Sequence, residues 1–138
     1  MTRSPPQLKK KLALVVEDDP AASRLIELSL MKLGLGVHTT SNGESALSFL
    51  QANPVDLLCL DLMLPNRSGF EVCELIRKSP MHASLPIIVI SARAEADTKA
   101  YAEEAGANAY LVKPFKRRDL EVYALRLLGL RPPRRPAS

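Results

Sequence analysis

The stretch LLCLDLMLP, residues 57–65, contains the most apolar run of the chain and places a carboxylate, Asp61, directly after it. A buried carboxylate without a partner is costly, so Asp61 must be solvated, paired with a cation or used in chemistry. The run VDLLCL at 55–60 is almost continuously apolar, which is typical of a strand buried on both faces of a parallel sheet. This stretch therefore predicts a covered parallel sheet with Asp61 at the end of one strand.

Short apolar runs alternate with amphipathic stretches from one end of the chain to the other. The expected strands are 12–16, 36–40, 55–60, 86–90 and 109–112, and the expected helices are 21–34, 43–53, 69–79, 94–106 and 116–129. Gly34, Gly106 and Gly129 stand where left-handed C-caps are expected. Five strand–helix repeats with right-handed crossovers predict an α/β fold, a doubly wound parallel sheet with helices on both faces.

The first expected helix has a clear start signal and an apolar stripe. Asp19 before Pro20 is a favourable N-terminal pair, since an aspartate caps well and proline suits the first helical turn. The stripe is formed by Leu25, Leu28 and Leu33, widened by Ile26 and Leu30. This spacing predicts that the stripe is the buried face of an amphipathic helix.

Length and composition indicate one cytoplasmic domain. A chain of 138 residues is long enough to bury a core. No apolar run approaches the ~20 residues of a membrane span, and the basic N-terminus lacks the apolar core and cleavage site of a secretory signal. Cys59 and Cys73 lie within apolar patterns and are interpreted as buried free thiols.

The two ends of the chain differ in composition from the rest. Residues 1–10 and 131–138 are rich in proline and basic side chains and are expected to be tails, with the folded domain at 11–130. The net charge of +4 comes from these tails, and the body is mildly acidic. Because aromatic residues are not interleaved with the basic ones and no DNA-binding motif is present, direct nucleic-acid binding is not expected.

Charged and hydroxyl side chains follow four of the expected strands. They are Glu17, Asp18 and Asp19 after the first strand, Asp61 after the third, Ser91 after the fourth and Lys113 after the fifth. Functional groups of doubly wound sheets gather at the carboxyl ends of the strands. Clustered carboxylates repel one another, and a divalent cation with oxygen ligands relieves this repulsion. We therefore expect Mg²⁺ at Glu17, Asp18 and Asp61, with Asp19 capping the next helix.

The same group of side chains suits phosphoryl transfer. A carboxylate such as Asp61 can accept a phosphoryl group as an aspartyl phosphate, a reaction that depends on positioning and charge neutralisation. Mg²⁺ and Lys113 would neutralise the phosphoryl oxygens, and the Ser91 hydroxyl would donate a hydrogen bond to one of them. Each residue alone is weak evidence, but their joint occurrence at strand ends favours this chemistry.

The motifs LVVEDDP, LLCLDLMLPNRSG, IIVISAR and AYLVKPF, in this order, resemble the receiver domain of two-component response regulators across roughly residues 11–130. The resemblance implies a flavodoxin-like sheet in the order 2-1-3-4-5 with five helices, as in single-domain chemotaxis regulators. It also implies that Asp61 accepts a phosphoryl group from a phosphohistidine of a sensor kinase or phosphotransfer protein, with Mg²⁺ as cofactor.

The resemblance also assigns ligands and a switch. Glu17, Asp18 and the backbone carbonyl of Met63 would join Asp61 in holding the metal. The peptide bond from Lys113 to the following proline is cis in this family. Ser91 and Tyr110 would form the switch pair that alters a surface at 94–128, where a downstream target or a homodimer partner binds.

Two positions depart from the family pattern. Ser91 is a less usual choice than threonine, and Arg67 stands where an apolar residue is common. Met63 and Arg93 occupy positions that tune the rate of dephosphorylation in the family. These departures bear on the strength of the switch and on the loop after Asp61.

The favoured interpretation is a signalling switch that catalyses its own phosphorylation and dephosphorylation, not an enzyme with an outside substrate. A phosphatase of the haloacid dehalogenase type would need a second acid where Met63 stands. A flavodoxin-like cofactor binder would need a phosphate loop rich in glycine and hydroxyl residues where this chain has three acids. The main alternative is a receiver fold that serves as a constitutive, unphosphorylated interaction module.

Overall fold

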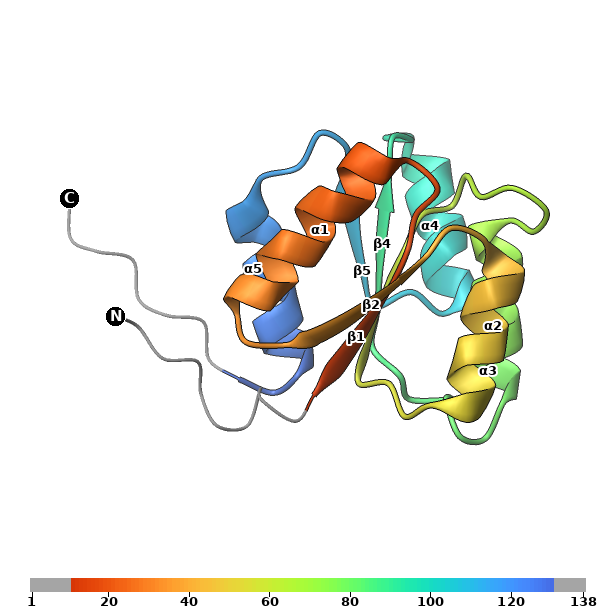
Figure 1. The fold of residues 1–138 in the computed structure, drawn as a ribbon. Helices are drawn as coiled ribbons and strands as arrows, with labels where there is room; N and C mark the ends of the chain where they lie inside the picture. The colour runs from red at the N-terminus through yellow and green to blue at the C-terminus, as the bar shows by residue number, and fades with distance from the viewer. Residues whose placement is uncertain (1–10, 131–138) are drawn as a thin grey trace.

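Five parallel strands form one sheet at the centre of the molecule, in the order β2-β1-β3-β4-β5 (Figure 1). The computed structural model describes residues 11–130, and the predicted tails at 1–10 and 131–138 lie outside the described residues. The strands are β1 (Leu12–Val16), β2 (Gly36–Thr40), β3 (Leu57–Leu60), β4 (Ile87–Ser91) and β5 (Ala109–Val112). The order confirms the predicted flavodoxin-like, doubly wound sheet.

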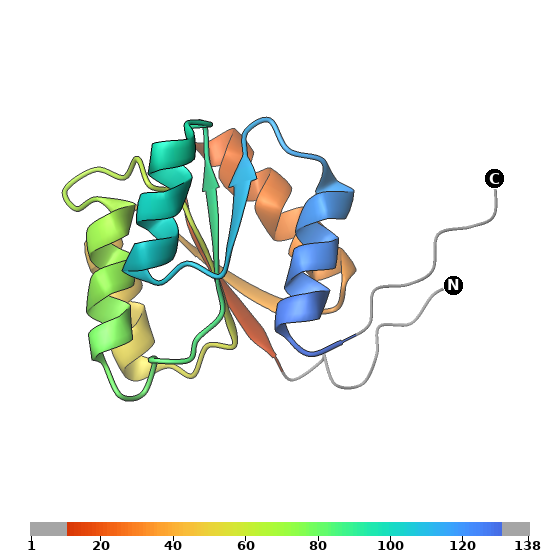
Figure 2. The same cartoon turned by 180° about the vertical axis from the view of Figure 1, so that it is seen from behind.

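The helices cover both faces of this sheet, as predicted. They are α1 (Pro20–Lys32), α2 (Gly43–Ala52), α3 (Gly69–Lys78), α4 (Ala96–Ala105) and α5 (Arg117–Leu127). Helices α1 and α5 lie on one face, and α2, α3 and α4 lie on the other (Figures 1 and 2). No helix within residues 11–130 is long and apolar enough to cross a membrane.

Alternate residues of the central strands point into two separate cores. Leu14 and Leu58 lie in the core beneath α2, α3 and α4, whereas Val15 and Cys59 lie in the core beneath α1 and α5. All four side chains are almost fully buried. Because strands β1 and β3 are covered on both faces, they need the near-continuous apolar sequence from which the parallel sheet was predicted.

The predicted capping residues lie at or beside the helix ends, although the helix bounds differ from the prediction by up to two residues at an end. Asp19 is the N-cap of α1, and its side chain accepts a hydrogen bond from the Ala22 amide at 3.0 Å. Gly34, Gly106 and Gly129 follow or cap α1, α4 and α5 with φ angles of 98°, 120° and 77°. A side chain is disfavoured at these angles, so glycine is the favoured residue for ending these helices.

The predicted apolar stripe of α1 is partly wrong. Leu25 and Leu28 are 39% and 43% exposed, and the buried positions are Ile26, Ser29 and Leu30. A serine can occupy the core face because its hydroxyl donates to the Leu25 carbonyl at 2.8 Å, which satisfies its polar group. The helix is therefore rotated away from the face that leucine spacing alone had indicated.

Candidate functional site

The site lies at the carboxyl ends of β1 and β3, which are neighbours in the sheet. Glu17 directly follows β1 and Asp61 directly follows β3, and the last residues of the two strands, Val16 and Leu60, are register partners. The Asp61 amide extends this ladder by donating to the Val16 carbonyl at 3.0 Å. Parallel pairing therefore brings together two acidic residues that are distant in the sequence.

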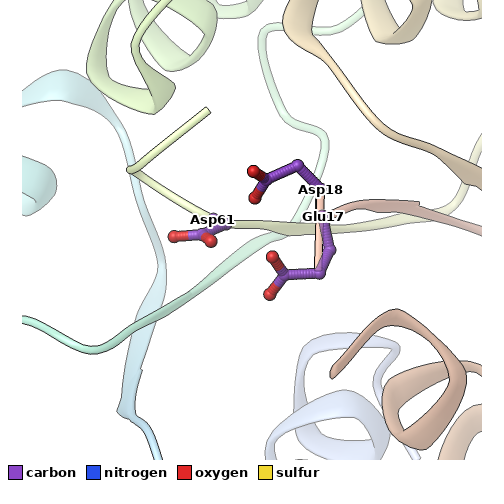
Figure 3. A group of neighbouring side chains, drawn as sticks. All are labelled: Glu17, Asp18 and Asp61. Atoms are coloured by element: carbon purple, nitrogen blue, oxygen red, sulfur yellow. The ribbon is translucent and has the colours of Figure 1, made fainter. Parts of the chain in front are cut away.

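Three carboxyl groups lie side by side at this edge, those of Glu17, Asp18 and Asp61 (Figure 3). One oxygen from each lies within 4.8 Å of the others. Glu17 and Asp61 are only 3% and 6% exposed, whereas Asp18 is exposed to solvent. An all-oxygen donor set that is open on one side suits a hard divalent cation that keeps some of its waters, so the residues fit Mg²⁺. The fourth acid, Asp19, caps α1 instead.

Lys113 supplies the only basic side chain that the described residues bring into salt-bridge contact with these carboxylates. Its ammonium donates hydrogen bonds to Glu17 Oε1 and, at 3.2 Å, to Asp61 Oδ2. Burial lowers the pKa of Lys113, but the hydrogen bonds and charges of the two carboxylates outweigh burial and leave its pKa raised. Lys113 therefore stays protonated. The Lys113–Pro114 peptide bond is cis, as the resemblance implied.

The buried position of Glu17 shifts the pKa of its carboxyl group. Burial raises its pKa to about 7, and the hydrogen bond from Lys113 only partly opposes this effect. The nearby Asp61 carboxylate raises the pKa of Glu17 further. One lysine does not neutralise two buried carboxylates and Asp18 together, so the site would gain from an additional cation.

The Glu17–Lys113 ion pair was not predicted from the sequence, where Lys113 was assigned to the phosphoryl group. The two residues are 96 positions apart. They meet because Glu17 directly follows the inner strand β1 and Lys113 directly follows the edge strand β5, at the same edge of the sheet. No local signal in the sequence indicates such a pair; only the sheet order places the lysine within reach.

Ser91 and Tyr110 both contact the backbone of Arg93. The buried Ser91 hydroxyl accepts a hydrogen bond from the Arg93 amide at 3.2 Å, and the Tyr110 hydroxyl donates to the Arg93 carbonyl at 2.8 Å. Ser91 is the last residue of β4, since it pairs with Val112 in the ladder, so the prediction that it follows the strand was off by one residue. The two predicted switch residues are thus linked through one peptide segment.

The loop after Asp61 is held at both of its ends. The Met63 amide donates to Asp61 Oδ1 at 3.0 Å, close to the carboxylate cluster. Farther along, Arg67 pairs with Glu44 at 2.6 Å and with Glu71 at 3.4 Å, which ties the loop to the first turns of α2 and α3. The unusual arginine at this position therefore has a structural explanation. The Met63 carbonyl as a metal ligand stays a prediction.

The two cysteines are buried and free, as predicted. Burial raises the pKa of Cys59 and of Cys73 to about 12. A protonated, solvent-excluded thiol is a poor nucleophile and a poor metal ligand. Neither residue lies in the carboxylate cluster, so the chemistry of the site belongs to its oxygen ligands and to Lys113.

A family-wide sequence comparison agrees with this geometry. The sequence model described as the response regulator receiver domain matches residues 13–124 of the chain. That range contains the carboxylate cluster, Ser91, Tyr110 and Lys113. The family match and the site therefore rest on the same part of the molecule.

Individual relatives and solved structures give the same picture. The transcriptional regulatory protein AfsQ1 of Streptomyces coelicolor is 42% identical over 108 residues, which cover 78% of this chain and 47% of AfsQ1. The chain spans about half the length of the curated relatives it matches. A protein of Chloroflexus aurantiacus described as a response regulator is 34% identical with a TM-score of 0.83, covering 86% of this chain and 98% of that one. The Mn²⁺-bound form of the response regulator Rcp1 is 30% identical with a TM-score of 0.71, covering 86% and 90%.

Proposed function

The chain belongs to the family of response regulator receiver domains, and from this premise we propose that it is a phosphorylation-dependent switch with Asp61 as the phosphoacceptor. The observation that carries the proposal is the convergence of Glu17, Asp18 and Asp61 with Lys113 at one sheet edge. Membership in the family places the domain in two-component signal transduction. The identity of the phosphorylated residue and the cation are parts of the proposal.

In the proposed reaction, an Asp61 carboxylate oxygen attacks the phosphorus atom of a phosphohistidine on a sensor kinase or phosphotransfer protein. A phosphorus–oxygen bond forms, the phosphorus–nitrogen bond breaks, and the departing imidazole nitrogen takes up a proton. Asp61 is suited to this role because it is nearly buried, yet the Met63 amide and the Lys113 ammonium donate hydrogen bonds to its two oxygens and so orient the carboxylate. Water later hydrolyses the aspartyl phosphate.

Glu17, Asp18, Asp61 and the Met63 carbonyl would hold Mg²⁺. When bound, the ion neutralises the negative charge that gathers on the phosphoryl oxygens. Lys113 would keep a second positive charge beside those oxygens, since its raised pKa keeps it protonated. The solved structure of Rcp1 is a Mn²⁺-bound form, which supports the proposal that this chain also binds a divalent cation.

Ser91 and Tyr110 would transmit the effect of phosphorylation from Asp61 to the surface of the protein. We propose that the Ser91 hydroxyl leaves the Arg93 amide to hydrogen-bond the phosphoryl group, which changes the segment to which Tyr110 is bonded. The surface of residues 94–128 would then bind a downstream protein target or a second copy of the chain in the cytoplasm. Because the chain spans about half of AfsQ1 and of the ycf27 proteins, named as transcriptional regulators, gene regulation is one setting for this output.

The test is to incubate the protein with Mg²⁺ and acetyl phosphate and to record its intact mass. We expect a gain of one phosphoryl group. The gain should vanish in Asp61→Asn and after chelation of the metal. Asp119→Asn makes the same chemical change at an exposed position in the first turn of α5 and should leave the gain intact.

A second outcome would favour the constitutive interaction module. In that case the folded, Mg²⁺-binding protein would show no adduct, and beryllofluoride, an analogue of the phosphoryl group, would not bind either. The beryllofluoride arm is needed because a short-lived adduct would also be missed by mass measurement. Binding of beryllofluoride to the parent protein but not to Asp61→Asn would support the switch.

A further inference from the structure

A groove of about 440 Å³ runs between α3 and α4, outside the carboxylate cluster. These helices lie side by side on the same face of the sheet (Figure 2). We call this the α3–α4 groove. It is lined by Ser68, Phe70, Glu71, Glu74, Arg93, Asp97, Thr98 and Tyr101.

The charge of the α3–α4 groove is negative and largely uncompensated. Three carboxylates line it, against the single cation of Arg93. Glu71 is partly engaged by Arg67 at 3.4 Å, from outside the groove. Within residues 11–130, Glu74 and Asp97 form no salt bridge, although both are exposed and stand on facing helices. An anionic occupant would be repelled, whereas a cation would find two unpaired carboxylates.

Aromatic side chains form the other part of the lining. The rings of Phe70 and Tyr101 meet edge to face, with centroids 4.7 Å apart and planes at 76°. Phe70 packs against the core, but Tyr101 is 52% exposed. The face of an aromatic ring attracts cations, and a planar guanidinium stacks on it better than an ammonium does. The groove therefore combines an aromatic surface with carboxylates, a pairing that favours arginine.

We propose that the α3–α4 groove binds an arginine side chain presented by a protein partner. The guanidinium would lie against Tyr101 and pair with Glu74 and Asp97. Charge complementarity selects this occupant, since an apolar side chain would leave both carboxylates unpaired. The volume of the groove suits one long side chain with its neighbouring backbone, and it is too small for a folded domain.

The groove also touches the segment that carries the proposed switch. Arg93 forms part of its wall, and the Arg93 amide and carbonyl are the partners of Ser91 and Tyr110. A partner in the groove would therefore contact the element that responds to Asp61. The binding itself does not require phosphorylation, so it is tested on the unphosphorylated chain, and its failure is distinct from failure of the proposed function.

The experiment is an NMR titration of the ¹⁵N-labelled full chain with N-acetylargininamide at low ionic strength. N-acetylcitrullinamide, which has nearly the same shape without the charge, is the matched ligand. We expect saturable amide shifts centred on Phe70, Thr98 and Tyr101 with the arginine ligand. The shifts with the citrulline ligand should be much smaller at equal concentration.

Three variants assign the binding to the groove. Glu74→Gln and Asp97→Asn should each weaken it by about two- to fourfold, as expected for removing one charge near a partly solvated cation. Tyr101→Leu should weaken it by about two- to fivefold through loss of the cation–π contact. Glu103→Gln changes an exposed carboxylate of the same helix outside the groove and should leave the affinity unchanged.

Several results would overturn the proposal. Absence of saturable shifts in the groove would do so, and so would equal binding of the citrulline ligand. An equal loss in Glu103→Gln would show that the ligand responds only to the overall charge of the chain. Each variant's own spectrum confirms that it is folded, so loss of binding cannot be mistaken for loss of structure.

Discussion

The Lys113 ammonium donates a hydrogen bond to Asp61 Oδ2 at 3.2 Å, although the two residues follow strands that are not neighbours. Strand β4 lies between β3 and β5, so the lysine side chain reaches past the end of β4 to meet the carboxylate. The same ammonium also bonds Glu17 at the end of β1. One cation therefore links the carboxyl ends of three strands.

Replacement of this cation by a neutral side chain of similar length should destabilise the fold in a pH-dependent way. We expect Lys113→Met to lower the free energy of unfolding by about 1–3 kcal/mol near pH 8, because two nearly buried carboxylates lose their shared hydrogen-bond donor. The loss should be smaller near pH 5.5, where Glu17, with its pKa raised to about 7, is protonated. Urea unfolding at the two pH values measures both effects.

Lys116→Met serves as the control, since it removes a positive charge from an exposed position nearby in the chain. Its effect should stay within about 0.5 kcal/mol at both pH values. If Lys113→Met costs the same at both pH values, its effect does not depend on the ionisation of Glu17.

Mg²⁺ should stabilise the protein more strongly as the pH rises. The pKa of Glu17 is raised from 4.5 to about 7, so the metal-free native state holds this proton more tightly than the unfolded state does. Without metal, this group therefore makes stability fall as pH rises from about 4.5 to 7. Metal binding requires the deprotonated form, so the gain in Tm on adding Mg²⁺ should be larger near pH 8 than near pH 5.5.

The gain is measured by thermal unfolding with saturating Mg²⁺ or with chelator. At ten times the dissociation constant, the stabilisation is about 1.4 kcal/mol, or several degrees in Tm for a domain of this size. Asp18→Asn should remove most of this stabilisation, because it removes one of the three carboxylates proposed to hold the metal. Asp18 is the exposed member of the cluster, so the substitution should disturb the packing little. A gain that is independent of pH, or that survives in Asp18→Asn, would contradict the assignment of this site.

Patterns of residue type were sufficient to predict a doubly wound parallel sheet with helices on both faces, and to predict that acidic residues and a lysine meet at its edge. The run from Leu57 to Leu60 is apolar because β3 is buried on both faces, and this condition is visible in the sequence alone. Asp61 and Lys113 were identified because polar residues that directly follow such strands must meet at one edge. The third strand begins at Leu57, not at residue 55 as predicted, because the Asp56 side chain accepts a hydrogen bond from the Leu12 amide.

Relations that depend on the exact path of the chain could not be predicted. The buried Ser29 has no sequence signal, since its burial depends on a hydrogen bond to its own helix. The pairing of Glu17 with Lys113 depends on side-chain reach across the sheet edge. The contacts of Ser91 and Tyr110 with Arg93 involve its backbone amide and carbonyl, which any residue except proline would supply. Such features appear only once the elements are placed in three dimensions.

Arg77 should be among the most sensitive positions away from the site. Its guanidinium donates to the carbonyls of Gly106, His82 and Ala83, and to the side chain of Asn108. It therefore ties the end of α3 to the segments before β4 and β5. We expect Arg77→Ala to cost about 2–3 kcal/mol, because two partly buried carbonyls, those of Gly106 and His82, lose their donor. Denaturant unfolding measures this cost.

Arg77→Lys should recover little of the lost stability, since an ammonium cannot reproduce the planar fork of donors. Lys78→Ala is the control, because it shortens the adjacent, exposed side chain and should change stability by no more than about 0.5 kcal/mol. Full recovery by lysine would show that charge, and not the hydrogen-bond geometry, is what this position supplies.

Gly69 should tolerate no side chain, because the loop after Asp61 folds back against it. A Cβ atom at this position would lie 2.5 Å from the Asp61 carbonyl oxygen and 2.6 Å from Leu62 Cα, both backbone atoms. Backbone cannot rotate away as a flexible side chain can, so Gly69→Ala must displace either the start of α3 or the segment that carries Asp61. We expect a loss of about 2–4 kcal/mol in denaturant unfolding, together with slower phosphorylation by acetyl phosphate.

Gly36→Ala is the matched control, since its Cβ would meet its nearest neighbours at 3.5 and 3.6 Å, ordinary contact distances. Equal stability of the two variants would mean that the loop after Asp61 can move without cost, and that the close approach does not position the carboxylate.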